Sequence, residues 1–204
     1  MYKVFFNDRT VLLTDDFIRN FQLKYGLFYK YRNVEDLKEL IEFYWKLKHI
    51  DTLFVFHHDL DELQERFKSC FHMIEAAGGL VQNEKGQYLI MKRRGKWDLP
   101  KGKVNIKETI PQAGIREVTE ETGLHELEIV TPLMSTYHSY LFEGQSILKR
   151  TSWFEMRYSG HSVPVPELDE DITEIQWISR EYLPEITKNT YLGVLDVLRY
   201  ANLL

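Results

Sequence analysis

The chain has 204 residues, of which 44% are hydrophobic and 28% are charged, and its formal net charge at pH 7 is -5. This composition is ordinary for a globular protein with one large domain or two small ones. A net negative charge gives no general attraction to nucleic acid or to acidic membranes, so we expect no general nucleic-acid binding. No apolar run approaches the roughly 20 residues that a membrane-spanning helix needs, so we expect no membrane partner.

Two features bear on the cellular compartment. The first ten residues, MYKVFFNDRT, lack the basic-then-apolar order of a secretory signal peptide. Cys70 is the single cysteine, which excludes an intramolecular disulfide and fits a reducing compartment. We therefore expect a cytoplasmic protein.

Residues 1–73 are predicted to form a small α+β domain of unknown role. The predicted elements are a hairpin of YKVFF and TVLLT about Asn7–Arg9, a strand in LKYGLFYKY, a helix capped by Asn33, a strand in TLFVFHH and a helix that begins at Asp59. His57 and His58 lack spaced cysteine or carboxylate partners, so we expect them to be structural rather than metal ligands. Five aromatic residues leave two roles open, a core of the domain itself or an interface: Phe5, Phe6, Phe28, Tyr29 and Tyr31.

Residues 74–204 have a different texture and are predicted to form a mixed sheet with two helices. The predicted elements are a hairpin of GGLVQ and QYLIMKRR, a tight loop WDLPKG, an acidic helix, two long strands on either side of Glu143–Gln145, a strand TEIQWIS and a C-terminal amphipathic helix.

The acidic helix is predicted to begin near Thr109 and Pro111 and to end at Gly123. An apolar stripe that includes Val118 is expected to face the sheet. Its acidic residues Glu117, Glu120 and Glu121 are spaced i, i+3 and i+4, so they share one side of the helix.

Two interpretations of these carboxylates are open. They could form a solvated helix face, with Arg116–Glu120 as an ordinary ion pair worth about 0.3–0.5 kcal/mol. Alternatively, a hard divalent cation with oxygen ligands could offset their mutual repulsion. The lysine- and glycine-containing loop before the helix favours the second interpretation, because anion donors beside cation ligands are what phosphoryl chemistry needs.

The spacing resembles the Nudix box, GX5EX7REUXEEXGU, in which U is an apolar residue. Gly102, Glu108 and the run REVTEETGL from Arg116 to Leu124 match every fixed position over 23 residues. The resemblance extends over roughly residues 74–204, including the late strand with Trp177, and it does not include the N-terminal domain. Gly114, where such helices often carry alanine, is a mild departure that concerns packing.

The resemblance implies an α/β fold, an α/β/α sandwich around a mixed sheet, and metal-dependent hydrolysis of a nucleoside diphosphate linked to another group. Mg²⁺ or Mn²⁺ is the implied cofactor. By position in the motif, the implied catalytic and metal-binding groups are Glu117, Glu120 and Glu121 as ligands or base, Glu108 as a further ligand, the backbone carbonyl near Lys101 as a ligand, and Arg116 as the residue that orients the glutamates. Gly102 and Gly123 are implied to be needed for backbone shape.

Residues outside the motif concern the substrate. The predicted phosphate contacts are Lys92, Arg94 and Lys103, and strand alternation places Arg93 on the face opposite Lys92. Tyr140, 16 residues past Leu124, resembles a tyrosine associated with dinucleoside polyphosphate hydrolases, although packing is an equal alternative for this aromatic residue. The resemblance also implies one further carboxylate before the last strand, from Asp169, Glu170 or Asp171.

A pyrophosphohydrolase is thus the expected function, acting on a small phosphorylated nucleotide. The position of Tyr140 points to a dinucleoside polyphosphate. Two rival functions remain: a non-catalytic nucleotide sensor and a cation-stabilised interaction module on the same scaffold. The intact motif favours catalysis over both. The N-terminal domain could shape the pocket, form a homodimer, or do neither.

Overall fold

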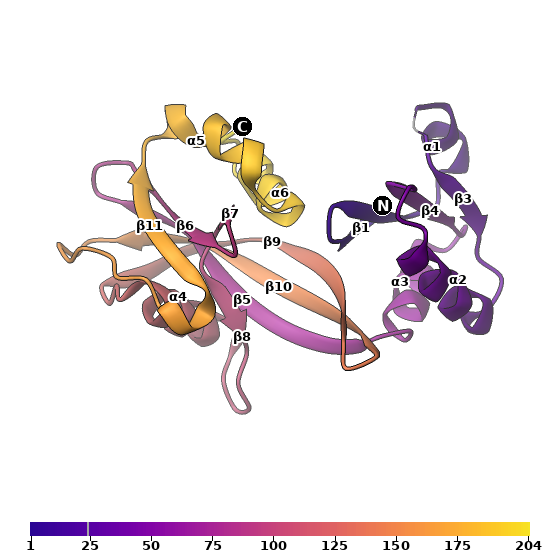
Figure 1. Cartoon of the computed structure of the whole chain (residues 1–204), viewed down its shortest axis with the longest axis horizontal. Helices are drawn as coiled ribbons and strands as arrows, with labels where there is room; N and C mark the ends of the chain where they lie inside the picture. The colour runs from indigo at the N-terminus through magenta and orange to yellow at the C-terminus, as the bar shows by residue number, and fades with distance from the viewer. Residues whose placement is uncertain (24) are drawn as a thin grey trace. The chain divides into compact units, whose positions relative to one another are not determined.

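The computed structural model describes residues 1–23 and 25–204, and these fall into two compact units (Figure 1). Unit 1 comprises Met1–Ile74 and Tyr137–Lys149, and unit 2 comprises Glu75–Thr136 and Arg150–Leu204. The two longest strands, β9 (Leu127–Phe142) and β10 (Gln145–Tyr158), therefore contribute residues to both units. Over the described ranges, no helix combines the length and the apolar character needed to cross a membrane.

Unit 1 contains the N-terminal strands and helices in an α+β arrangement. Its elements are β1 (Tyr2–Phe6), β2 (Arg9–Thr14), α1 (Phe17–Leu23), β3 (Leu27–Lys30), α2 (Val34–Lys46), β4 (Thr52–Phe56) and α3 (Leu60–Lys68). The strand order is β9-β1-β2-β4-β3, with β1 antiparallel to β2 and with parallel pairs at β1–β9, β2–β4 and β4–β3.

Local signals in unit 1 predicted most of these elements. The hairpin about Asn7 is confirmed, as are the helix caps, in which Asn33 and Asp59 accept backbone N–H groups at 2.8 and 2.9 Å. The strand predicted in LKYGLFYKY is only partly correct, because β3 begins at Leu27 and Leu23 belongs to α1, a short helix that was not predicted. Lys24, which that prediction also included, lies outside the described residues.

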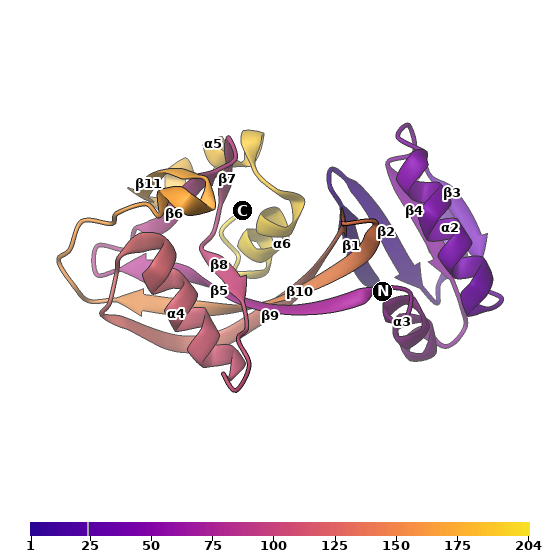
Figure 2. The same ribbon diagram turned by 60° about the horizontal axis from the view of Figure 1, so that its bottom comes forward.

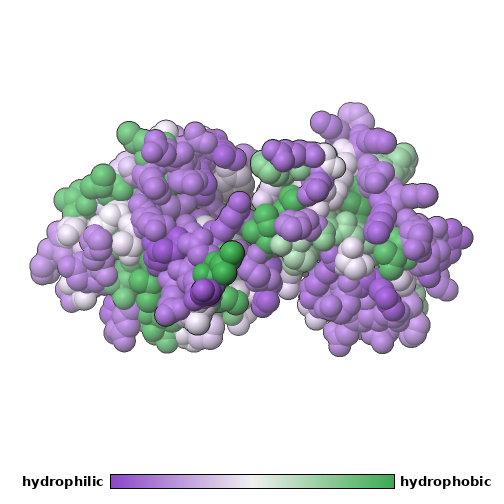
Figure 3. All heavy atoms as spheres, turned by 90° about the horizontal axis from the view of Figure 1, so that it is seen from below, coloured by the Kyte–Doolittle hydropathy of each residue, from purple (hydrophilic) through white to green (hydrophobic). Residues whose placement is uncertain are grey.

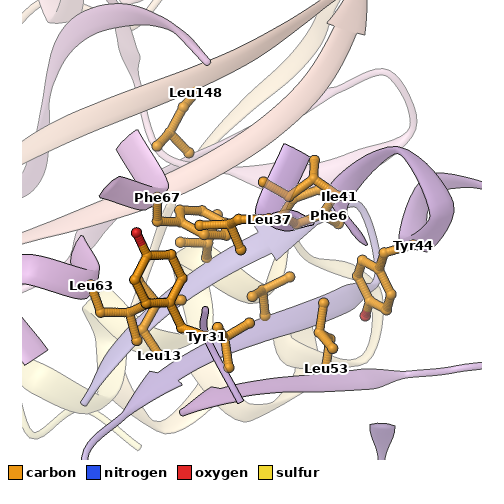
Figure 4. Packing of buried hydrophobic residues seen from close by; sticks show 13 residues of the cluster. Phe6, Leu13, Tyr31, Leu37, Ile41, Tyr44, Leu53, Leu63, Phe67 and Leu148 are labelled. Carbon is orange, nitrogen blue, oxygen red and sulfur yellow. The ribbon is translucent and has the colours of Figure 1, made fainter. Parts of the chain in front are cut away.

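The core of unit 1 lies between its sheet and the helices α2 and α3. Phe6, Leu37 and Leu63 are fully buried there, and Leu148 from β10 joins them (Figure 4). Phe6 also packs against Tyr44 with a ring-centroid distance of 5.5 Å. Three of the aromatic residues considered above, Phe5, Phe6 and Tyr31, are buried within the chain, which favours the interpretation of a core.

Unit 2 is built on the remaining strands and three helices. Its elements, apart from its parts of β9 and β10, are β5 (His72–Asn83), which begins in unit 1, β6 (Tyr88–Arg93), β7 (Lys96–Asp98), β8 (Lys101–Lys103), α4 (Ile110–Thr122), β11 (Ile172–Ile178), α5 (Leu183–Ile186) and α6 (Leu192–Tyr200). The strand order is β11-β6-β5-β10-β9, with β7 paired to β6 and β8 paired to β5.

Alternation along these strands produces two separate apolar layers. Leu80 and Ile90 face α5 and α6, whereas their neighbours Val81 and Leu89 face α4. Because successive side chains in a strand point to opposite faces, the sheet is covered by helices on both sides (Figure 2). The predicted α/β/α layering is confirmed. The face of unit 2 seen in the space-filling view is mostly hydrophilic with separate apolar spots (Figure 3).

Two predictions in unit 2 need correction. The segment WDLPKG was predicted as a loop, but its two ends form β7 and β8, and only Leu99 and Pro100 connect them. The C-terminal helix, predicted over residues 186–204, is also shorter: Ile186 ends α5, a 3-10 turn follows, and α6 spans Leu192–Tyr200. In both cases long-range backbone pairing or packing decides the outcome, and local periodicity does not report it.

Candidate active site

Helix α4 is fixed at both ends by short-range chemistry. The Thr109 side chain accepts from the backbone N–H of Gln112, and the Gln112 side chain accepts from the Thr109 backbone N–H, which forms a capping box. Pro111 lies in the first turn, where its missing N–H costs nothing. Gly123 ends the helix with a φ of 71°, a left-handed conformation that favours glycine. The predicted limits of the helix are confirmed.

Arg116, in the middle of α4, is the centre of a carboxylate cluster. Its guanidinium forms a bidentate pair with Glu108, with Nε–Oε1 and Nη2–Oε2 distances of 2.7 and 2.9 Å. Its Nη1 donates to Glu117 at 2.8 Å and to Glu120 at 2.6 Å, and its Nη2 donates to the backbone carbonyl of Lys103 at 2.8 Å. The guanidinium lowers the pKa of Glu108, and these carboxylates raise the pKa of Arg116.

Gly102 leaves the space that the Glu117 carboxylate fills. A Cβ on Gly102 would lie 1.7 Å from Oε2 of Glu117, which is far inside van der Waals contact. The first glycine of the motif is therefore required by close approach, because any larger side chain would displace this carboxylate.

Glu121 lies deeper than the other carboxylates, with 2% of its surface exposed, whereas the Glu120 side chain is 50% exposed. Oε2 of Glu121 accepts the backbone N–H of Lys101 at 2.7 Å, and Oε1 accepts from Arg93 Nη1 at 3.0 Å. Burial raises the pKa of Glu121 to about 7, although the charges of Lys101 and Arg93 act in the opposite direction.

The segment before β11 is held against the C-terminal end of α4. The backbone N–H groups of Val165 and Glu167 donate to the carbonyls of Thr122 and Glu121 at 2.8 and 3.3 Å. In the 3-10 turn Leu168–Glu170, the carboxylate of Glu170 pairs with Arg93.

The three acidic residues proposed before β11 thus have different surroundings. Glu170 shares Arg93 with Glu121, so it is joined to the acidic helix through one side chain. Asp171 pairs instead with the exposed Arg94 at 3.0 Å, and Asp169 is exposed.

The residues predicted to contact substrate are dispersed. Lys92 lies over the ring of Trp97, with Nζ 5.7 Å from the centroid, and Arg94 lies beyond the end of β6 with a φ of 51°. Lys103 is exposed, and its backbone carbonyl accepts from Arg116. Tyr140 belongs to unit 1, where its ring centroid is 5.8 Å from that of His138 and burial raises its pKa. Their roles toward substrate stay predictions.

Two charged residues have contacts at the site that the sequence did not predict: Arg93, considered only as a phosphate contact, and Asp98, which was not considered. Arg93 was placed by alternation on the face opposite Lys92, and this is the side chain that reaches Glu121. Asp98 is buried and pairs with Nζ of Lys101 at 2.5 Å. The alternation along β6 could have identified Arg93, because one face of that strand must meet α4. No local signal distinguishes Asp98 from an ordinary loop aspartate.

The donors near α4 fit a hard divalent cation in their chemistry, since the groups implied by the motif all offer oxygen. Among residues 1–23 and 25–204, no three acidic, histidine or cysteine side chains are arranged as a ready metal site. The contacts give the reason, because Glu117 and Glu120 direct oxygens at Arg116 while Glu121 faces Arg93 and Lys101. The space beside Gly102 keeps the Glu117 carboxylate close to β8, where the implied backbone ligand lies.

Comparisons with known proteins agree with this geometry. The NUDIX domain family matches residues 73–195. An RNA pyrophosphohydrolase of Novosphingobium aromaticivorans is 25% identical over 146 residues, which is 60% of this chain and 89% of that protein. A MutT4-type mutator protein of Mycobacterium tuberculosis is 32% identical over 94 residues, 45% of this chain and 37% of that protein, so the chain matches well under half of this relative's length.

A solved structure shows the same fold. The Ap4A hydrolase of C. elegans, in a binary complex, superposes with a TM-score of 0.51 at 21% sequence identity, over 63% of this chain and 95% of that chain. The family match covers more than half of the chain, from the end of unit 1 to α6, and it contains the complete motif on α4. The chain belongs to the Nudix family.

Proposed function

We propose that the chain is a metal-dependent pyrophosphohydrolase that cleaves a phosphoanhydride linkage in a nucleoside diphosphate derivative. The observation that carries this proposal is the joining of Glu108, Glu117 and Glu120 by Arg116, beside a glycine whose missing side chain makes room for Glu117. A solvated helix face would need neither the bidentate Arg116–Glu108 pair nor the space at Gly102.

The residues that would hold the cation are Glu117, Glu120 and Glu121, with Glu108 and the backbone carbonyl near Lys101 as further donors. When bound, Mg²⁺ or Mn²⁺ supplies Lewis-acid chemistry: it neutralises pyrophosphate charge and polarises the attacked phosphorus. Arg116 orients the carboxylates from behind and does not contact substrate. It binds one carboxylate oxygen of Glu117 and one of Glu120 through Nη1.

The protein's own part in the reaction is proton transfer and charge stabilisation. A glutamate carboxylate accepts a proton from the attacking water while the oxygen of that water bonds to phosphorus. The bridging P–O bond breaks, and the leaving phosphate takes the electron pair. The predicted phosphate contacts Lys92, Arg94 and Lys103 would stabilise that charge.

Glu170 is the further carboxylate that we propose from the segment before β11. It shares Arg93 with Glu121, whereas Asp171 is occupied by Arg94. This arrangement brings a carboxylate from a second segment next to the acidic helix, where we propose that it assists proton transfer.

The first substrate candidate that we propose is a dinucleoside polyphosphate, because Tyr140 lies 16 residues after the end of the motif at Leu124. A 5′-triphosphate RNA end is the second candidate, favoured by the match to the RNA pyrophosphohydrolase of Novosphingobium aromaticivorans along most of that protein's length. We place the reaction in the cytoplasm, in agreement with a single free cysteine, Cys70.

A phosphate-release screen tests this proposal. The full chain would be incubated with Mg²⁺ or Mn²⁺ and with dinucleoside polyphosphates, 5′-triphosphate RNA, nucleotide sugars, ADP-ribose, nucleoside triphosphates and inositol pyrophosphates. We expect metal-dependent release from one of the first two classes. Release from another class would overturn the substrate assignment. No release from any class, together with a melting temperature that Mg²⁺ does not change, would favour a solvated acidic face over hydrolysis.

A further inference from the structure

A buried ion pair lies beside the acidic helix in residues that the Nudix motif does not include. Asp98, the last residue of β7, is 4% exposed, and its Oδ2 accepts from Nζ of Lys101 at 2.5 Å. Its Oδ1 accepts the backbone N–H of Leu99 at 2.8 Å. The Lys101 side chain is 18% exposed, so the pair is largely removed from water.

Lys101 is also tied to the acidic helix, at its backbone. Its N–H donates to Oε2 of Glu121 at 2.7 Å, while its side chain reaches Asp98. The Lys101 charge lowers the pKa of Glu121 and the Asp98 charge raises it, so both groups lie within electrostatic reach of that carboxylate.

Opposite charges alternate along a row of side chains that crosses the site. Three carboxylates and two cations come from five separate segments. The Arg93 guanidinium contacts both Glu121 and Glu170, whereas the Lys101 ammonium contacts Asp98 and only the Lys101 backbone N–H contacts Glu121. In order, the row is Asp98, Lys101, Glu121, Arg93 and Glu170.

We propose that Asp98 is a positioning residue that holds the Lys101 ammonium away from the Glu121 carboxylate, so that Glu121 stays available to the divalent cation. This inference rests on the proposed function, since it assigns Asp98 a part in the same metal site. Asp98 acts through Lys101 and touches neither the cation nor the substrate.

The physical reason is the cost of an unpaired buried charge. Without the negative charge of Asp98, the Lys101 ammonium would lie in a poorly solvated site with no full countercharge on that side. The backbone N–H of Lys101 is already bound to the Glu121 carboxylate, so this carboxylate is a nearby countercharge for the ammonium. The attraction between unit charges is stronger in a buried site than in water. The ammonium would then compete with the divalent cation for the same oxygens.

The test is direct Mn²⁺ binding without substrate, measured by electron paramagnetic resonance on the full chain. Asp98→Asn keeps the shape of the side chain and removes its charge. We expect this variant to bind Mn²⁺ roughly 10-fold more weakly than the wild type, the size seen when groups behind metal ligands are changed. The double variant Asp98→Asn, Lys101→Met lacks the competing ammonium as well, so its Kd should return to within about 3-fold of the wild type.

The double variant also guards against misfolding, because neutralising both partners of a buried ion pair leaves no unpaired charge. Circular dichroism and the melting temperature would be recorded for each variant. An unchanged Kd in a folded Asp98→Asn protein would overturn the inference. The inference would also be overturned if the double variant binds Mn²⁺ no more tightly than Asp98→Asn does. Asp98 would then act on the conformation of the loop and not through the Lys101 charge.

A different result would identify failure of the proposed function. If the wild type binds no Mn²⁺, or if Glu117→Gln and Glu120→Gln bind it as tightly as the wild type does, the proposed metal site is wrong. The proposed role of Asp98 is then wrong as well. If the wild type binds Mn²⁺ at these glutamates and Asp98→Asn binds equally well, only the role of Asp98 is wrong.

Discussion

The burial of each carboxylate at this site depends on its own contacts, and these differ sharply between residues that are adjacent in sequence. Glu120 and Glu121 are adjacent in sequence, yet one is half-exposed on Arg116 and the other is buried between Arg93 and the Lys101 backbone. Helical spacing could predict that both project near one side of α4. It could not predict their depth, because that depends on β6 and β8, which reach the helix through long-range strand pairing.

Gly102→Ala should reduce activity because its methyl group would occupy the place of the Glu117 carboxylate, 1.7 Å from Oε2. A displacement of about 1 Å at a catalytic group costs about 100-fold in rate, and we expect a fall of that order in kcat/KM. Steady-state hydrolysis of the substrate identified by the screen measures it.

Gly114→Ala is the matched control, because its Cβ would meet Phe154 and Met156 at 3.2 Å on the face of α4 that packs against β10. Its kcat/KM should stay within a few-fold of the wild type. Equal activities in Gly102→Ala and the wild type would show that the space beside Gly102 has no part in positioning Glu117.

Glu121 should make the metal-free protein less stable as pH rises. Its pKa is raised from an ordinary value of 4.5 to about 7 in the folded chain, chiefly by burial. Below about 4.5 the carboxyl is protonated in both the folded and unfolded states and has no effect. Between 4.5 and 7 the unfolded chain ionises first, so the free energy of unfolding falls, by at most about 3 kcal/mol.

Glu121→Gln tests this sign, because glutamine resembles the neutral carboxyl. In chelator, the melting temperature of the variant minus that of the wild type should increase from pH 4.5 to pH 7.5. A difference that is constant over this range, or that decreases, would mean that Arg93 and Lys101 fully compensate the buried charge.

At the scale of elements, α4 is the part of the fold that the sequence predicts best. Its limits depend on Thr109, Pro111, Gln112 and Gly123, which act within one turn of the chain and therefore leave a readable pattern. The strands β7 and β8 are the opposite case. Lys101 pairs with Gly78 and Trp97 with Lys92, so these short strands exist only because distant segments meet them.

Thr109→Ala should destabilise the protein by about 1 kcal/mol, because it removes the side-chain oxygen of the capping box. Denaturant unfolding followed by circular dichroism measures the change. Thr131→Ala, at an exposed threonine, is the control and should lie within about 0.5 kcal/mol of the wild type. Equal stability in the two variants would argue that the first turn of α4 is held by tertiary packing and not by its cap.

At the scale of the whole chain, the N-terminal region is not simply an appendage to the Nudix domain. The end of the β9–β10 hairpin belongs to unit 1, where β1 pairs with β9 and Leu148 enters the core. The change of composition noted from the sequence lies at Ala76–Gly79, close to residue 73, where the family match begins. No sequence signal shows that the end of the β9–β10 hairpin belongs to unit 1, because the alternation of apolar and polar residues continues unchanged through both strands.

Removing residues 1–73 should therefore damage the remaining chain. The truncated protein would expose Tyr137 and Leu148, which pack against the core of unit 1 in the full chain. We expect lower solubility and stronger binding of the hydrophobic dye ANS than for the full chain. A truncated protein that is equally soluble and binds no more dye would show that the hairpin end needs no cover from unit 1.

The homodimer stays a prediction at this scale, and Phe5, Phe6 and Tyr31 are buried within the chain rather than exposed for an interface. Light scattering on the full chain would decide it, with a mass near 24.4 kDa for a monomer and twice that for a dimer.

The most direct measurement of the central claim is metal-dependent turnover by Glu120→Gln and Glu117→Gln beside the wild type and Glu185→Gln, a change at an exposed ion pair with Lys188. We predict losses of at least about 100-fold in both variants at the motif, with unchanged circular dichroism, and normal turnover in Glu185→Gln. Wild-type rates in folded Glu120→Gln and Glu117→Gln would contradict the claim that these carboxylates hold the cation on which hydrolysis depends.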